Sequence, residues 1–269
     1  MAIISKQVKD DKMPEIEDRQ VVEHNDLITS IAKMDKTPLK IFELAASCID
    51  TENPPKDNIV YLSKVELFKF FDVSDSNKHS RFKQAIEVMQ KQAFFEVKEK
   101  KGKGFKYRSI VPIPTVTWND YNDNVEIFFN PYIMPYLIDL GTKYTQYAIS
   151  DIMELNSKYS IILYKWLSMH FNQFEYYTKK GERRKEQLEE YRNPIIKVSE
   201  LRIITDTENE YKRSDHFEKW IIQTPLNEIN AHSHFDVTYD KIKKGRSIDS
   251  IQFHITKKAQ PQELNGEYK

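Results

Sequence analysis

One local pattern occurs twice along this chain, and that repetition restricts the possible folds more than any other feature. In each half, a helix with a polar stripe leads directly into two strands joined by a turn rich in Lys, Arg and Gly. The turns are Lys100-Lys101-Gly102-Lys103-Gly104 and Lys243-Lys244-Gly245-Arg246. Apolar residues at helical intervals, followed by apolar residues at alternate positions on both sides of a glycine turn, indicate a helix and then a hairpin. The sequence therefore predicts an α+β fold of two tandem winged-helix domains related by internal duplication.

The first half is expected to contain a helix, a strand and two further helices, followed by the hairpin. A helix is expected to begin at Thr37, with threonine as the cap and a proline in the first turn, and to end before Asn53. A strand over 59–62 should follow, and Ser63 with Glu66 predicts the capping box of a second helix. The third helix and the hairpin are expected over 76–92 and 94–113.

The second half repeats this order around a long charged segment. Residues 176–193 have almost no apolar content and are expected to form a charged, solvated loop or helix extensions joined by a loop. Pro225 is expected to interrupt or bend the last helix, because proline has no amide hydrogen to donate. The expected elements are helices over 157–171, 199–205 (capped by Ser199) and 213–230, then strands over 235–239 and 248–255.

A chain of 269 residues has room for two ordinary domains. The predicted division is a flexible arm over 1–20, an N-terminal winged-helix domain over 21–140, a C-terminal winged-helix domain over 141–258 and a flexible tail over 259–269. The N-terminus lacks the apolar stretch of a signal peptide, and no apolar run approaches the length of a bilayer span. A cytoplasmic protein without membrane contact is therefore expected.

The net charge of zero does not exclude a nucleic-acid partner, because the charges are segregated. Residues 77–108 contain ten Lys or Arg and three Glu, whereas residues 10–26 contain seven acidic and two basic residues. Residues 115–139 contain four acidic residues and no Lys or Arg. A polyanion responds to the local field, because salt screens charges beyond about 8–10 Å. The two acidic segments are instead candidates to contribute to a dimer interface.

The second half carries the stronger candidate for DNA recognition. Lys212, His216, Lys219 and Gln223 have the spacing of one helix face, and Arg213 lies beside them at the helix N-terminus. Helices inserted into the major groove read base edges with such long polar side chains. The wing-tip residues expected to contact phosphate are Lys243, Lys244 and Arg246. In the first half the corresponding DNA-binding candidates are Asn77, Lys78, Arg81, Gln84, Lys101 and Lys103.

The segment from Tyr211 to Asn230 resembles the recognition-helix region of theta-type, iteron-binding plasmid replication initiators. It has a basic start, an acidic–aromatic pair, a hydrophobic middle and a closing Asn-Glu-Ile-Asn. The segment 241–255 is similar to the second wing of that family, and 198–202 to its preceding helix. His216 separates the aspartate from the phenylalanine, which are adjacent in relatives, so individual base contacts do not transfer.

The resemblance implies a function that spacing alone does not show. It implies a bacterial protein that binds tandem origin repeats in double-stranded DNA as a monomer, reads bases mainly through its C-terminal winged helix and starts theta replication. It also implies a dimer that represses the initiator's own gene, an N-terminal domain that contacts adjacent DNA or forms the dimer interface, and host initiator and helicase proteins as partners. It implies no enzymatic activity, cofactor or metal.

Three other classes of function are alternatives to an initiator: a nickase, a transcriptional regulator and a protein-interaction scaffold. A rolling-circle nickase would use a metal-binding histidine pair and a tyrosine, but in His232-Ser233-His234 a serine replaces the required hydrophobic residue. Cys48 is the only cysteine, which rules out a zinc site built on several thiolates. A winged-helix transcriptional regulator needs the same groove contacts and stays open as the alternative. A protein-interaction scaffold predicts no salt-dependent affinity for DNA.

Overall fold

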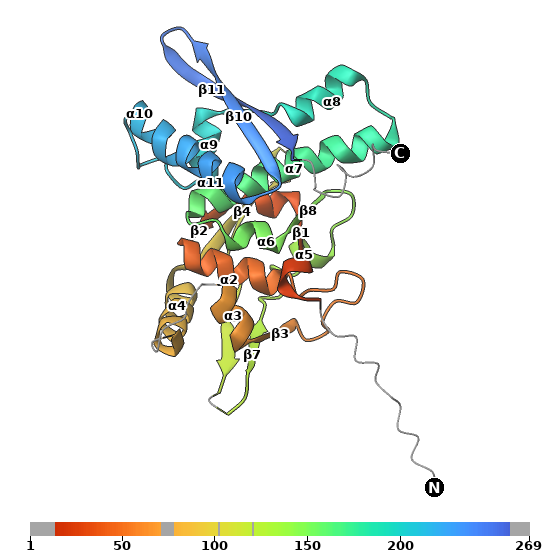
Figure 1. The fold of residues 1–269 in the computed structure, drawn as a ribbon, viewed down its shortest axis with the longest axis vertical. Coiled ribbons are helices and arrows are strands. Elements are labelled where there is room, and N and C mark those ends of the chain that lie inside the picture. Colours follow the sequence, from red (N-terminus) through yellow and green to blue (C-terminus); the bar gives the residue numbers. More distant parts are fainter. Residues whose placement is uncertain (1–13, 71–77, 102, 120, 259–269) are drawn as a thin grey trace, which may run out of the picture.

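The computed structural model describes residues 14–70, 78–101, 103–119 and 121–258 (Figure 1). Two units of helices and strands meet around the long helix α7, and the C-terminal hairpin projects from one end of the molecule (Figure 1). The predicted tail, Asn77 and the first part of the predicted arm lie outside the described residues.

The first half forms the predicted helices and strand as α2 (Lys36–Ala46), β3 (Ile59–Ser63), α3 (Lys64–Phe70) and α4 (Lys78–Gln92). The capping box is confirmed, because the backbone N–H of Glu66 donates to Ser63 Oγ at 2.9 Å and that of Ser63 donates to Glu66 Oε2 at 3.1 Å. The predicted cap at Thr37 is wrong, because α2 begins one residue earlier with Asp35 at the N-cap. The same helix ends at Ala46, several residues before the prolines that were expected to stop it.

Strand pairing shows that the basic hairpin of the first half is not its wing. In the C-terminal half, β9 (Ile195–Lys197), β10 (Phe235–Lys244) and β11 (Ser247–Lys257) pair in the order β10-β11-β9. The equivalent order in the N-terminal half is β3-β7-β6, in which β6 (Thr115–Trp118) and β7 (Asn124–Phe128) form the hairpin beside β3. The β6–β7 hairpin therefore holds the position of the N-terminal wing.

The hairpin with the basic glycine turn is an additional one. Strands β4 (Phe94–Lys101) and β5 (Gly104–Ile110) pair with each other, and β4 pairs with β2 (Ile31–Lys33) in a separate sheet. The predicted hairpin itself is confirmed, but its predicted equivalence to the C-terminal wing is wrong. Periodicity reveals a hairpin without revealing its neighbouring strand, because that neighbour lies far away in sequence.

The charged segment of the second half is helical, so the prediction of a loop over 176–193 is wrong and its alternative, helix extensions, holds. Helix α7 (Lys158–Lys180) continues to a turn at Gly181, which has φ +71°, and α8 (Lys185–Arg192) follows. The rings of Tyr177 and Tyr191 stack at 5.4 Å and hold the two helices together. The next helix, α9 (Val198–Ile204), has Lys197 at its N-cap, so the predicted cap at Ser199 is also wrong.

The two halves are joined across the predicted boundary at residue 140. Strand β1 (Gln20–His24) pairs antiparallel with β8 (Tyr144–Ala148), and α7 packs against β8 and α2 as well as against α8 and the last helix of the chain. The remaining short elements of this region are a 3₁₀ turn (Ile16–Asp18), α1 (Asn25–Ile28), α5 (Pro135–Ile138) and α6 (Ile149–Met153). None of the helices in the described ranges has the length and apolar content needed to cross a bilayer.

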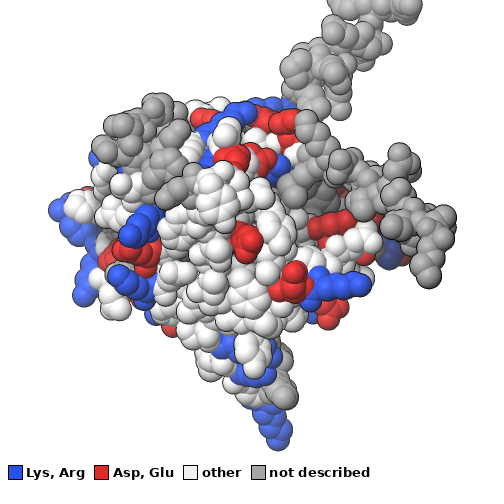
Figure 2. Space-filling model, turned by 90° about the horizontal axis from the view of Figure 1, so that it is seen from below, with Lys and Arg blue, Asp and Glu red and all other residues white. Residues whose placement is uncertain are grey.

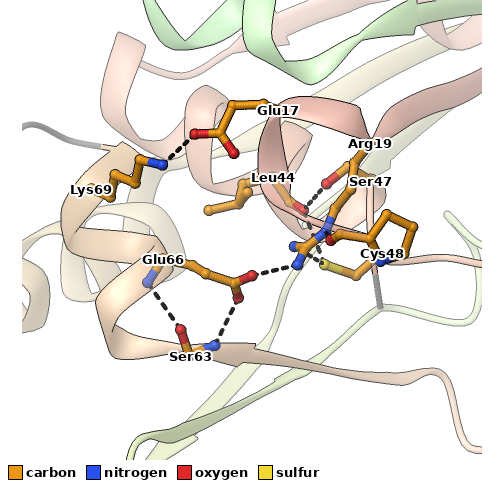
Figure 3. A network of polar contacts seen from close by, with 9 residues as sticks. Glu17, Arg19, Leu44, Ser47, Cys48, Ser63, Glu66 and Lys69 are labelled. Atoms are coloured by element: carbon orange, nitrogen blue, oxygen red, sulfur yellow. Dashed lines mark hydrogen bonds and ion pairs between the residues drawn. The ribbon is translucent and has the colours of Figure 1, made fainter. Parts of the chain in front are cut away.

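Residues 14–19 are fixed against α3, so the prediction of a flexible arm is wrong from Pro14 onward (Figure 3). The side chain of Arg19 is 4% exposed; its Nε donates to the carbonyl oxygen of Pro14 at 2.8 Å and its guanidinium pairs with Glu66. Lys69 of α3 pairs with Glu17. The carboxylate that closes the capping box thus also anchors the N-terminal segment.

A buried ionic cluster links α7 to the N-terminal half. Lys165 Nζ of α7 lies 2.8 Å from Glu23 Oε2 of β1 and 2.6 Å from Glu43 Oε1 of α2, and the side chains of both glutamates are 0% exposed. Tyr147 of β8 donates its hydroxyl to Glu43 Oε2 at 2.7 Å. Two carboxyl groups share one ammonium at a site that is closed to solvent. Burial, reinforced by the charge of Glu43, raises the pKa of Glu23 to about 8.

Replacing Glu23 by Gln is expected to flatten the dependence of stability on pH. The pKa of Glu23 rises from 4.5 to about 8 on folding, so its stabilising contribution is complete below pH 4.5 and is lost as the pH rises through 8. Gln cannot titrate, so Glu23→Gln should lose less stability than the wild-type protein across this range. Urea unfolding at several pH values measures the difference. Parallel pH profiles for the two proteins would contradict the assignment.

Candidate nucleic-acid interface

The C-terminal recognition element is a helix with a widened turn in its middle. It comprises α10 (Ser214–Phe217), a π-helical turn (Glu218–Gln223) and α11 (Thr224–His232). Phe217, Ile221 and Ile229 are at most 4% exposed and anchor the element to its domain. The predicted interruption of the α-helix is the π-helical turn, and Pro225 follows it in the first turn of α11.

The π-helical turn changes which side chains share a face. Lys212 precedes α10, and the π-helical turn contains more residues per turn than an α-helix. The prediction that Lys212, His216, Lys219 and Gln223 share one α-helical face is therefore wrong in its geometry. All four are exposed, but Gln223 Nε2 is directed to the wing, 3.3 Å from the hydroxyl of Tyr239 in β10.

Arg213 and Lys219 keep exposed, cationic side chains on this element. Arg213 makes two hydrogen bonds to the carboxylate of Asp215, at 3.1 and 2.6 Å. This pairing lowers the pKa of Asp215, mainly through the side-chain hydrogen bond. The ammonium of Lys219 lies 5.0 Å from the ring centroid of Trp220, which is 45% exposed. Both contacts are on the surface and are weak enough to be exchanged for contacts with DNA.

Glu218 joins the recognition element to the wing. Its carboxylate accepts a hydrogen bond from the Tyr239 hydroxyl at 2.7 Å and bonds from Lys241 at 2.9 and 3.1 Å. These partners, the hydrogen bond from Tyr239 foremost, lower the pKa of Glu218. This connection fixes the base of the wing relative to the helix, and local sequence spacing does not predict it.

The C-terminal wing has the predicted basic tip. The turn Gly245-Arg246 connects β10 and β11, and Gly245 has φ +65°, a conformation that favours glycine. Lys243, Lys244 and Arg246 are all exposed at this tip. The wing therefore carries three cations beyond the body of the domain, beside the recognition element.

The first-half candidates are spread over two places. Lys78 begins α4, and Arg81 and Gln84 of the same helix are exposed and border a cavity of about 680 Å³ next to the N-terminus of α2. Lys101 ends β4 and Lys103 is exposed in the adjoining turn. Among the candidate side chains that the structure describes in this half, Arg81 and Gln84 thus lie at the cavity beside α2 and Lys103 lies in the β4–β5 turn.

The opposite end of the molecule has a different surface. Figure 2 views the structure from the end at which β3, β7 and α3 lie in Figure 1, and residues other than Lys, Arg, Asp and Glu make up most of that face. Tyr61 and Val65, 51% and 67% exposed, belong to β3 and α3. On that face Lys and Arg lie mostly around the edge and are mixed with Asp and Glu (Figure 2), and a surface without a cluster of cations is a poor one for a polyanion. The wing end is thus the better candidate for duplex DNA.

The histidines considered for a nickase do not converge on a site. His234 Nδ1 lies 2.5 Å from Asp151 Oδ2, which also accepts a hydrogen bond from Tyr164 at 2.6 Å, whereas His232 is exposed. Within the described ranges, no group of three or more His, Cys, Asp or Glu side chains is placed to hold a metal ion. His170 lies against Trp166, with ring centroids 4.3 Å apart, and burial lowers its pKa to about 4.

Comparisons with known proteins agree with this architecture. Residues 20–168 match the family described as "Initiator Replication protein, WH1", and residues 197–255 match "Initiator Rep protein, WH2". A replication initiation protein of Escherichia coli is 22% identical over 209 residues, which are 76% of this chain and 58% of that protein. The chain thus spans a little over half the length of this relative.

Among solved structures, the Pi initiator protein in complex with iteron DNA has the same fold. The TM-score is 0.68 at 15% sequence identity, and the alignment covers 91% of this chain and 99% of the other. The family matches and the structural similarity therefore both support two winged-helix units in this chain. The chain belongs to the family of replication initiator proteins that combine a WH1 and a WH2 winged-helix domain.

Proposed function

We propose that this protein is a plasmid replication initiator that binds direct repeats, or iterons, in double-stranded DNA at the origin and starts theta replication there. The observation that carries the proposal is the match of both initiator domains, in order, along one chain. The presence of iteron DNA in the structure of the Pi initiator protein supports repeats as the ligand to test first. The proposed role takes place in the bacterial cytoplasm and requires no catalysis, cofactor or metal.

The proposed contacts divide between bases and phosphates. Arg213, His216 and Lys219 are exposed on the recognition element and reach base edges, whereas the wing-tip cations contact phosphate. The hydrogen bonds of Glu218 to Tyr239 and Lys241 support this division, because they hold the helix and the wing base in one relative position. The first-half candidates contact DNA adjacent to the repeat.

We extend the proposal to a monomer–dimer equilibrium in which the dimer represses the initiator's own gene, with host initiator and helicase proteins as further partners. Sedimentation across a range of concentrations, with and without repeats, tests the equilibrium. A single unchanged species would count against it. The alternative function is a winged-helix transcriptional regulator without an origin role, which would bind one palindrome rather than several direct repeats.

The decisive experiment is fluorescence anisotropy with the purified protein. It compares the direct repeats beside the protein's own gene with a scrambled duplex, at two salt concentrations. Preference for the repeats of about a thousandfold or more is expected for a sequence-specific binder. Equal, weak and salt-sensitive binding to both duplexes would refute the assignment of the recognition element and favour the regulator.

Replacing Lys243 and Lys244 singly by Ala is expected to weaken binding to repeats and to scrambled DNA by similar factors. Each lysine that contacts phosphate releases about one counterion, so each variant should flatten the slope of log affinity against log salt by roughly one. Titrations at several salt concentrations measure the slope. A loss confined to the repeats would instead place these side chains against bases.

A further inference from the structure

The hairpin of β4 and β5 has no counterpart in the C-terminal winged helix. Between α4 and the β6–β7 hairpin the N-terminal half contains this extra pair of strands, whereas the last helix of the C-terminal half leads directly into its wing. The base of the extra hairpin is anchored by Phe95, Val97 and Ile110, each at most 4% exposed. Its outer part extends beyond these residues and carries exposed side chains.

Two aromatic rings lie exposed on one face of this outer part. Phe105 and Tyr107 are 53% and 70% exposed, and as residues i and i+2 of β5 they point to the same side of the hairpin. Strand pairing places Lys98 directly opposite Tyr107. Exposed rings at this spacing form a flat apolar surface on a strand pair that has solvent beside it.

Lys98 links the two rings through its ammonium group. Its Nζ lies 4.1 Å from the ring centroid of Phe105 and 5.7 Å from that of Tyr107. Lys103 and Lys106 are exposed on the same hairpin. An exposed contact between an ammonium and a ring is weak, so another planar group can replace the lysine on the ring while the lysine moves to a nearby anion.

The C-terminal wing differs from this hairpin. Its tip carries Lys243, Lys244 and Arg246, and all large hydrophobic side chains described for its strands are buried or half-buried. Cations without rings suit the phosphates of a duplex, whose bases are already stacked on each other. Rings interleaved with cations suit a strand whose bases are unstacked, because every base can stack on an aromatic side chain.

We infer that the β4–β5 hairpin binds single-stranded DNA, with Phe105 and Tyr107 stacking on successive unpaired bases and Lys98 contacting the intervening phosphate. The contact is independent of sequence, since stacking uses the face of the base and not its hydrogen-bonding edge. The inference rests on the proposed function for its setting: an initiator that opens an origin produces such a strand close to its own binding sites.

Binding of a labelled oligothymidine of about twenty nucleotides to the full-length protein tests the inference directly. The double variant Phe105→Ala/Tyr107→Ala is expected to bind the oligonucleotide at least about tenfold more weakly than the wild-type protein. Its affinity for duplex repeats should change by no more than about twofold. Tyr176→Ala is the matched control, because Tyr176 is 52% exposed on α7, outside both hairpins, and its ring also lies near a lysine ammonium, so both affinities should be unchanged.

A conservative variant separates stacking from folding. Phe105→Tyr/Tyr107→Phe retains both rings and should retain the single-strand affinity, and Lys98→Gln should flatten the salt dependence of oligothymidine binding by roughly one contact. Equal single-strand affinity for the alanine double variant and the wild-type protein would overturn the inference, as would an equal loss on duplex repeats. A wild-type protein that binds no oligothymidine would also overturn it. So would an alanine double variant whose only loss is the binding of a protein partner.

The two proposals fail separately. If the wild-type protein shows no preference for duplex repeats but binds oligothymidine through the two rings, the proposed function fails and the single-strand site stands. If it prefers repeats and the ring variant has normal single-strand affinity, the initiator function stands and the site is wrong.

Discussion

Replacing Lys165 by Met is expected to reduce the free energy of unfolding by about 3–5 kcal/mol. The ammonium of Lys165 is the cation of a cluster whose two carboxyl groups, on Glu23 and Glu43, are wholly buried. Removing it leaves a buried carboxylate without its partner, and the cost of that charge exceeds the gain from a methionine of similar shape. Urea unfolding followed by circular dichroism measures the loss.

The matched control lies on the same helix. Lys179 is exposed near the end of α7, and Lys179→Met should change stability by no more than about 0.5 kcal/mol. The double variant Lys165→Met/Glu43→Gln should recover part of the loss, because it removes a buried charge along with its partner. A loss below about 1 kcal/mol in the single variant would show that the cluster is open to water.

Replacing Arg213 by Ala is expected to weaken binding to the cognate repeats by about 1–3 kcal/mol, a factor of about 5 to 150. Arg213 is exposed at the start of the recognition element, and its surface ion pair with Asp215 is weak enough to be exchanged for a base contact. The effect should be largest at particular bases and should relax the preference there. Anisotropy with single-base variants of the repeat measures it.

Two comparisons make this prediction specific. Lys56→Ala removes an exposed cation from the loop before β3, remote in the fold from the wing, and should leave repeat binding unchanged. Asp215→Asn releases Arg213 from its ion pair and removes a negative charge, so it should raise affinity for duplex DNA of any sequence. If Arg213→Ala lowered affinity for repeats and scrambled DNA equally, Arg213 would be a phosphate contact and not a base-reading residue.

Much of the candidate site was predictable because it depends on local chemistry. The buried anchors Phe217 and Ile221, the basic tip of the C-terminal wing and the capping box of Ser63 and Glu66 all follow from residues close together in sequence. Local spacing does not predict in the same way which of the polar side chains of the recognition element share a face. A π-helical turn has no distinct sequence periodicity, so regular α-helical spacing places Gln223 on the groove side, whereas in the structure its amide contacts Tyr239.

Local spacing predicts most of the helices, both hairpins with basic turns and the family resemblance, because each depends on residues close together in the chain. The folded structure is needed to identify the N-terminal wing, since β3 pairs with β7 rather than with the hairpin that follows α4. It alone brought Lys165 to Glu23, 142 residues away, and left Phe105 and Tyr107 exposed. Burial and strand partners are set by contacts between distant segments, which local periodicity does not encode.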